Sequence, residues 1–182
     1  MRPIVLIGLP GSGKSTVGVE LSRRLGWKFT DLDAEIERET GRTIAKIFKD
    51  DGEARFRDLE TSLLEKTLTA AAQQVVATGG GIVEREQNRK LLKLRSQTVY
   101  LELPVAEAAA RVRADEAKAL SAARPLFTGA ADLAEVTERL IALLNRREPF
   151  YRSADVVVPS GERSVDEVVA EIESAIKSLS RT

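Results

Sequence analysis

The sequence predicts an α/β domain in which a five-stranded parallel sheet lies between two layers of helices. Five short apolar runs alternate along the chain with segments whose apolar residues recur at helical spacing. Parallel strands need crossover connections, and helices between the strands supply them while covering both faces of the sheet. The 182 residues, of which 43% are hydrophobic, suffice for one core, so we expect a single domain over residues 1–182.

Composition and charge exclude several classes of function. Positive and negative residues number 28 each, so no overall basic field favours nucleic acid or an anionic membrane as a partner. The chain has no histidine and no cysteine, which excludes a Ser-His triad, a histidine base and thiolate metal sites. No signal-like segment and no apolar run of about 20 residues is present, so we expect a cytoplasmic protein.

The most specific motif lies between the first predicted strand, residues 4–7, and the first helix, residues 17–25. Residues 8–16 read G-L-P-G-S-G-K-S-T and match the phosphate-binding pattern G-x-x-x-x-G-K-[ST]. The glycines let backbone N–H groups converge on phosphate oxygens, and the helix N-terminus adds partial positive charge. We expect Lys14 at the β and γ phosphates of a nucleotide and Ser15 on Mg²⁺. A plain strand-to-helix turn seldom places lysine and serine in this register.

The second predicted strand, residues 27–33, follows Gly26 at the end of the first helix and finishes in two carboxylates. Strand residues two apart share a face, so we expect Asp31 and Asp33 to project together at the edge where open α/β sheets bind ligands. A turn-forming aspartate pair is the alternative. Two short helices, broken at Gly41, follow this strand.

A longer helix is predicted over residues 53–72, opened by Gly52. One face of it carries Glu53, Arg57 and Glu60 at positions i, i+4 and i+7. By itself, this spacing favours ion pairs along the helix surface more than a binding role for the arginine.

The third predicted strand, residues 74–78, runs into Gly79, Gly80 and Gly81. Three consecutive glycines sacrifice chain entropy, so we expect close approach of the backbone to another group, or positive φ; a flexible turn is the alternative. The remaining elements predicted by periodicity are strands at residues 98–103 and 155–159, and helices at residues 87–94, from 105, 133–147 and 165–179.

Residues 113–131 interrupt the helical pattern with proline and glycine around Arg124 and form a candidate lid. A mobile arginine would exclude water and bring a cation to a transferring phosphoryl group, although an ordinary surface loop is as compatible with this composition. Arg146 and Arg147 end the helix before Pro149, where cations are ordinary partners of the helix dipole. The topology gathers one set of loops around a single cleft: residues 8–16, 31–33, 79–81, 124 and 160–163.

Several further motifs accompany the nucleotide loop: F-T-D-L-D at 29–33, G-E-A-R-F-R-x-x-E at 52–60, T-G-G-G at 78–81, R-P-L at 124–126 and R-x-x-x-Y-x-x-A-D at 147–155. This ordered set resembles the shikimate kinase family, a group of small P-loop kinases of the nucleoside-monophosphate-kinase-like class. The similarity runs over almost the whole chain. The segment between Arg111 and Arg124 looks longer than in many members of the family.

The resemblance implies a P-loop kinase fold and an ATP-dependent kinase that converts shikimate to shikimate 3-phosphate, with release of ADP, in chorismate and aromatic amino acid biosynthesis. It implies that shikimate is held by Asp33, Arg57, Gly79, Gly80, Gly81 and Arg147. It implies that ATP is held by Gly11, Ser12, Gly13, Lys14, Ser15, Thr16, Arg111, Arg124 and Arg163, and Mg²⁺ by Ser15 and Asp31. It further implies that the two acceptor-site arginines clamp the substrate carboxylate, and that the catalytic residues are Lys14, Asp33 and Arg124.

Two other classes of function stay open at this stage. Another small-metabolite kinase, such as a gluconate kinase or a nucleoside monophosphate kinase, would share the nucleotide loop, but Asp33 with two arginines favours a polyol that bears a carboxylate. A non-catalytic nucleotide-binding module is disfavoured because Lys14, Ser15, Asp31 and Asp33 are all intact. We expect a monomer without nucleic-acid or membrane partners.

Overall fold

The computed structural model of the chain describes residues 2–70, 73–117 and 132–179. Its sheet has five strands, all parallel, in the order β2-β3-β1-β4-β5. The strands are β1 (Ile4–Ile7), β2 (Lys28–Asp31), β3 (Gln74–Ala77), β4 (Gln97–Glu102) and β5 (Val156–Pro159). The predicted five-stranded parallel sheet is therefore confirmed.

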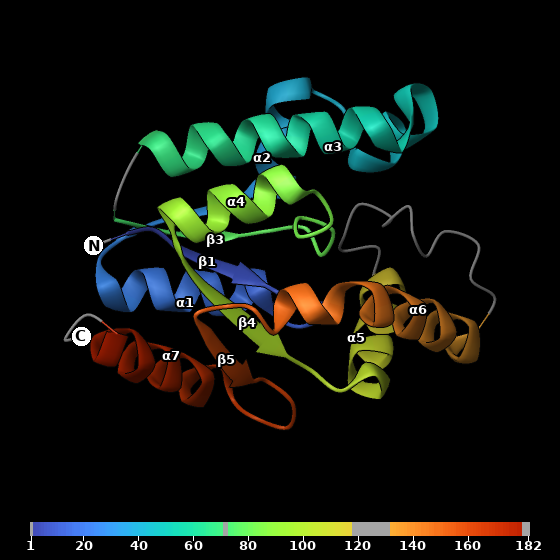
Figure 1. The fold of residues 1–182 in the computed structure, drawn as a ribbon. Helices are drawn as coiled ribbons and strands as arrows, with labels where there is room; N and C mark the ends of the chain where they lie inside the picture. Colours follow the sequence, from blue (N-terminus) through green and yellow to red (C-terminus); the bar gives the residue numbers. More distant parts are fainter. Residues whose placement is uncertain (1, 71–72, 118–131, 180–182) are drawn as a thin grey trace.

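Helices cover both faces of the sheet, as Figure 1 shows. They are α1 (Lys14–Leu25), α2 (Leu32–Thr40), α3 (Ile44–Ala70), α4 (Glu86–Arg95), α5 (Val105–Ala117), α6 (Leu133–Tyr151) and α7 (Val165–Leu179). Side chains alternate along β1, so Ile4 and Leu6 pack with α1 and α7, whereas Val5 and Ile7 pack with α2 to α6. The central strand is buried on both sides, and the described helices include none long and apolar enough to cross a membrane.

The prediction that Asp31 and Asp33 share one face of a strand is wrong. Strand β2 ends at Asp31, and α2 begins at Leu32, so Asp33 lies in the first helical turn. The Asp31 side chain caps this helix, because its Oδ1 accepts hydrogen bonds from the backbone N–H groups of Asp33, at 3.0 Å, and Ala34, at 3.3 Å. An N-cap carboxylate satisfies donors that the helix itself leaves unpaired.

The prediction that a helix ends at Arg147 is also wrong, because α6 continues through Pro149 to Tyr151. Proline removes one backbone donor, but near the end of a helix this costs a single hydrogen bond, and the next turn still forms: the Arg152 N–H donates to Glu148 O at 2.8 Å. Arg147 therefore lies inside the helix and is 1% exposed. The predicted break at Gly52 is confirmed, since this residue interrupts α3 with φ 81° and ψ 169°.

Candidate active site

The loops at the carboxyl ends of the strands surround a cavity of about 850 Å³. Its polar lining comes from Ser12, Lys14, Ser15, Thr16, Asp31, Asp33, Glu37, Arg57, Glu60, Thr78, Arg111, Asp115, Ser160 and Arg163, with backbone from residues 11, 13 and 79–81. The loops that the sequence places around one cleft thus meet there. Arg124 and most of the candidate lid, residues 113–131, lie outside the described part of the chain.

The nucleotide loop closes around the ammonium group of Lys14. Lys14 Nζ donates to the backbone oxygens of Gly8, at 3.0 Å, and Leu9, at 2.8 Å, and lies 3.3 Å from Ser12 Oγ. Gly11 has φ 83°, and a Cβ there would lie 2.8 Å from the backbone oxygen of Ala108. The loop therefore depends on glycine at this position, and it holds a buried positive charge at its centre.

Ser15 and Asp31 meet beside this loop. Ser15 Oγ donates to Asp31 Oδ2 at 2.5 Å, while the other oxygen of Asp31 caps α2. Two oxygen donors are too few to enclose a metal, and the described residues contain no group of three or more acidic, histidine or cysteine ligands that could. Mg²⁺ keeps waters and phosphate oxygens in its coordination shell, so this small oxygen donor set fits it.

Asp33 and Glu60 approach each other over the α-carbon of Gly79. A Cβ at Gly79 would lie 3.0 Å from Asp33 Oδ1 and 2.9 Å from Glu60 Oε1. Glu60 is fully buried, and burial raises its pKa to about 7; the Arg57 guanidinium opposes this rise, whereas the charge of Asp33 adds to it. This end of the cavity therefore contains a buried carboxyl group whose pKa is raised well above its ordinary value.

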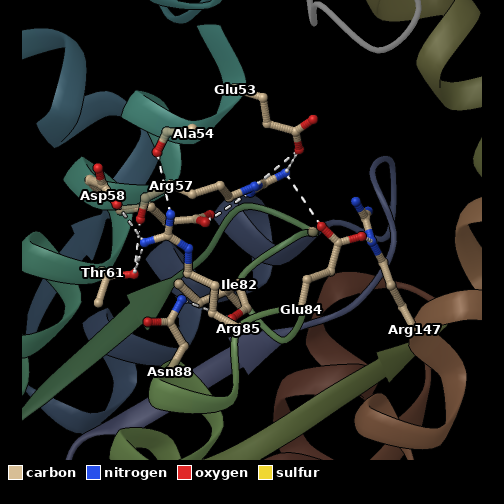
Figure 2. A network of polar contacts seen from close by, with 12 residues as sticks. Glu53, Ala54, Arg57, Asp58, Thr61, Ile82, Glu84, Arg85, Asn88 and Arg147 are labelled. Atoms are coloured by element: carbon tan, nitrogen blue, oxygen red, sulfur yellow. Dashed lines mark hydrogen bonds and ion pairs between the residues drawn. The ribbon is translucent and has the colours of Figure 1, made fainter.

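Arg57 is surrounded by carboxylates, as Figure 2 shows. Its Nη1 donates to Glu60 at 2.8 Å, its Nε and Nη2 donate to Glu53 at 3.3 and 3.1 Å, and Nη2 lies 3.8 Å from Glu84 Oε2. Burial disfavours the charged form, but Glu60 and Glu53 outweigh burial and raise the pKa of Arg57. The ion pairs that the helical spacing of Glu53, Arg57 and Glu60 predicts are therefore confirmed, and Arg57 also lines the cavity.

Arg147 lies deeper, behind the glycine turn. Its Nε donates to Glu84 Oε1 at 2.9 Å, and its buried Nη1 forms no hydrogen bond with any group in the described ranges. That nitrogen lies 3.3 Å from where a Cβ of Gly80 would be. Tyr151, one turn further along α6, donates from its hydroxyl to Gly80 O at 2.5 Å and fixes the turn against the helix.

The three glycines that follow β3 are needed for space and not for positive φ, because none of them has a φ in the left-handed region. The tightest contact is at Gly81, where a Cβ would lie 2.4 Å from both Nη1 and Nη2 of Arg57. The predicted close approach of the backbone is confirmed. Charged side chains approach Gly79 and Gly81, whereas Pro10 and the Gly8 backbone oxygen approach Gly80 together with Arg147.

Arg111 and Arg163 line the nucleotide end of the cavity. Arg111 Nη1 donates to Gly11 O at 3.4 Å, and Arg163 Nη1 donates to Pro159 O at 3.0 Å and to Glu171 at 2.6 Å. Both cations therefore flank the phosphate-binding loop, from α5 and from the turn before α7.

Sequence reasoning missed Glu60, Glu84 and Tyr151 as residues of the site. Glu60 lies one helical turn after Arg57, and Tyr151 one turn after Arg147, so helical spacing carried a signal for both. Glu84 lies in the turn that follows β3, where periodicity says nothing about which charges it meets. Its three arginine partners are Arg57 of α3 and Arg146 and Arg147 of α6.

Comparisons with known proteins identify the family of the chain. The family model described as shikimate kinase matches residues 10–177. The shikimate kinase of Chlorobium chlorochromatii is 38% identical and aligns with 98% of this chain and 93% of its own length; that of Thermobifida fusca is 44% identical, with 94% and 92% covered.

Solved structures give the same result. A shikimate kinase from Acinetobacter baumannii in complex with shikimate is 36% identical, with a TM-score of 0.89 over 98% of this chain and 94% of that one. A gluconokinase from Sinorhizobium meliloti, at 19% identity and a TM-score of 0.60, shares the fold alone. The chain therefore belongs to the shikimate kinase family.

Proposed function

We propose that this chain transfers the γ-phosphoryl group of ATP to the 3-hydroxyl of shikimate, producing shikimate 3-phosphate and ADP on the route to chorismate and the aromatic amino acids. One observation carries the proposal: a single cavity holds the phosphate-binding loop at one end and the Asp33, Arg57 and glycine-turn cluster at the other. Two substrates bound at these ends meet between Lys14 and Asp33.

Phosphoryl transfer passes through a loose, anionic transition state, so positioning and electrostatic stabilisation supply most of the acceleration. Lys14 turns from the carbonyl groups of its own loop toward the β and γ phosphate oxygens. Arg124 brings a second cation from the lid, and Thr16, Arg111 and Arg163 hold the rest of the nucleotide. Bound Mg²⁺ would be held by Ser15 and, through water, by Asp31, and it would neutralise phosphate charge.

Asp33 orients the acceptor hydroxyl and takes its proton as the new bond forms. Its place in the first turn of α2, over Gly79, directs the carboxylate at the acceptor end of the cavity. Arg57 and Arg147 bind the substrate carboxylate, for which planar guanidinium groups are better suited than lysine. Replacing Arg57 by alanine is expected to raise the KM for shikimate about 10- to 100-fold with little change in the KM for ATP.

A coupled assay of ADP release tests the proposal with shikimate, gluconate and nucleoside monophosphates as separate acceptors. We expect ADP release above the background of ATP hydrolysis only with shikimate. Release with gluconate or a nucleoside monophosphate, but not with shikimate, would replace the proposal by one of those activities. Release with none of them would support a non-catalytic nucleotide-binding role.

We also propose that the protein works as a monomer in the cytoplasm. All the assigned residues of both substrate sites come from one chain, so no second subunit is required to complete the cavity. Sedimentation at micromolar concentration is expected to give the mass of one chain, 19.9 kDa. A stable dimer would contradict this part of the proposal.

A further inference from the structure

Glu84 places one carboxylate between the two arginines of the acceptor site. Its Oε1 accepts a hydrogen bond from Arg147 Nε at 2.9 Å, and its Oε2 lies 3.8 Å from Arg57 Nη2. Figure 2 shows the side chain reaching from the turn after β3 into the space between the two guanidinium groups. It bridges a cation of α3 and a cation of α6, as a bound carboxylate would.

We propose that Glu84 is an affinity-determining residue: in the free enzyme its carboxylate holds the position that the carboxylate of the acceptor takes, and it thereby weakens acceptor binding. The inference rests on the proposed function, which assigns Arg57 and Arg147 to the substrate carboxylate. It concerns this chain's own side chain at position 84.

The charges around Arg57 support the inference. Three carboxylates already face this guanidinium, from Glu53, Glu60 and Glu84, and each of its nitrogens lies within ion-pair or hydrogen-bond distance of one of them. An entering carboxylate must either share the arginines with Glu84, against the repulsion of like charges, or displace it from Arg147. In both cases the negative charge at position 84 opposes an anionic acceptor.

Of the three carboxylates around Arg57, Glu84 is the one that also pairs with Arg147, and its surroundings allow it to move when an acceptor carboxylate enters. Its side chain is 28% exposed, whereas that of Glu60 is fully buried beneath Arg57. On the solvent side, Arg146 Nη2 lies 3.3 Å from Glu84 Oε1, and the Arg146 side chain is 66% exposed. Glu84 already pairs with this exposed cation and can keep it as a partner after leaving Arg147, so its displacement does not leave an unpaired charge in the interior.

The variant Glu84→Gln tests this inference, because glutamine keeps the size and the oxygen acceptor for Arg147 Nε and removes the charge. We expect the KM for shikimate to fall about three- to tenfold, with kcat and the KM for ATP unchanged. Glu86→Gln is the matched control, because it removes the same charge two residues further along the chain. Glu86 pairs with Lys90 at the surface. Its KM for shikimate is expected to equal that of the wild type.

Calorimetric titration of shikimate into the wild type and into Glu84→Gln measures the Kd for shikimate without turnover, and we expect it to fall by the same factor as the KM. An unchanged KM and Kd in Glu84→Gln would overturn the inference. A raised KM would overturn it too and would make Glu84 a residue that positions Arg147. An equal fall in Glu86→Gln would trace the effect to overall charge and also overturn it. Wild-type protein that releases no ADP with shikimate would instead refute the proposed function, and the inference with it.

Discussion

The two ends of the cavity are built in different ways. The nucleotide end is formed mainly by backbone groups. Glycines with positive φ shape the loop, and the carbonyl groups of Gly8 and Leu9 accept hydrogen bonds from the Lys14 ammonium. At the acceptor end, side chains from α3, α6 and the turn after β3 form a network of ion pairs over three glycines, and Asp33 of α2 lies beside it. A backbone cradle recognises phosphate in general, whereas a side-chain network can be altered one charge at a time to suit one acceptor.

The sharpest way to break this comparison is the variant Asp33→Asn. The amide cannot take the acceptor proton, so we expect kcat to fall about 10²- to 10⁴-fold while the KM for ATP stays within about twofold of the wild type. Steady-state kinetics with ATP and shikimate varied separately measure both. Normal kcat in this variant would refute the role of Asp33 as a base.

Lys14→Met tests the nucleotide end. Methionine keeps most of the length of the side chain and removes the positive charge, so we expect kcat to fall about 10²- to 10³-fold through the loss of transition-state stabilisation. Circular dichroism serves as the control, because the loop also uses this ammonium to pair its own carbonyl groups. A folded variant with wild-type kcat would show that Lys14 does not act on the transferring group.

A pair of glycine variants sharpens the comparison further. Gly81→Ala places a Cβ 2.4 Å from the Arg57 guanidinium, so we expect the KM for shikimate to rise about tenfold and the KM for ATP to stay constant. Gly11→Ala places a Cβ 2.8 Å from Ala108 O at φ 83°, so we expect the reverse pattern. Steady-state kinetics of each variant, with shikimate and ATP varied separately, measure both KM values. A rise of both KM values in the same variant would show that the two ends of the cavity are not independent.

The last prediction concerns stability and leaves the comparison of the two substrate sites unchanged. The pKa of Glu60 is about 7 in the folded chain, whereas the ordinary value for an exposed glutamate, as in the unfolded chain, is 4.5. The folded state therefore binds the proton more tightly than the unfolded state does. The free energy of unfolding therefore falls as pH rises from about 4.5 to 7, by up to about 3 kcal/mol from this group. Glu60→Gln removes that contribution, so its urea-unfolding free energy is expected to decline less over this pH range than that of the wild type. Equal declines would contradict the pKa shift.

The same difference between the ends explains what could be predicted from the sequence. The individual strands and the nucleotide loop are each signalled by residues close in sequence, so periodicity and a nine-residue motif were sufficient to predict them. Asp33 was placed on a strand because alternation cannot reveal that Asp31 caps a helix. The contacts of Glu84 were not predictable, because its partners are 27, 62 and 63 residues away and no local pattern connects them.

Asp31 limits how this site can vary. One of its oxygens accepts the N–H groups at the start of α2, and the other accepts the Ser15 hydroxyl at the start of α1. Asparagine at this position would retain a cap but lose the negative charge, and glutamate would retain the charge but is a poorer helix cap because its chain is longer. Aspartate supplies the helix cap, the acceptor for the Ser15 hydroxyl and a negative charge from one short side chain, so asparagine and glutamate would each lose one of these contributions.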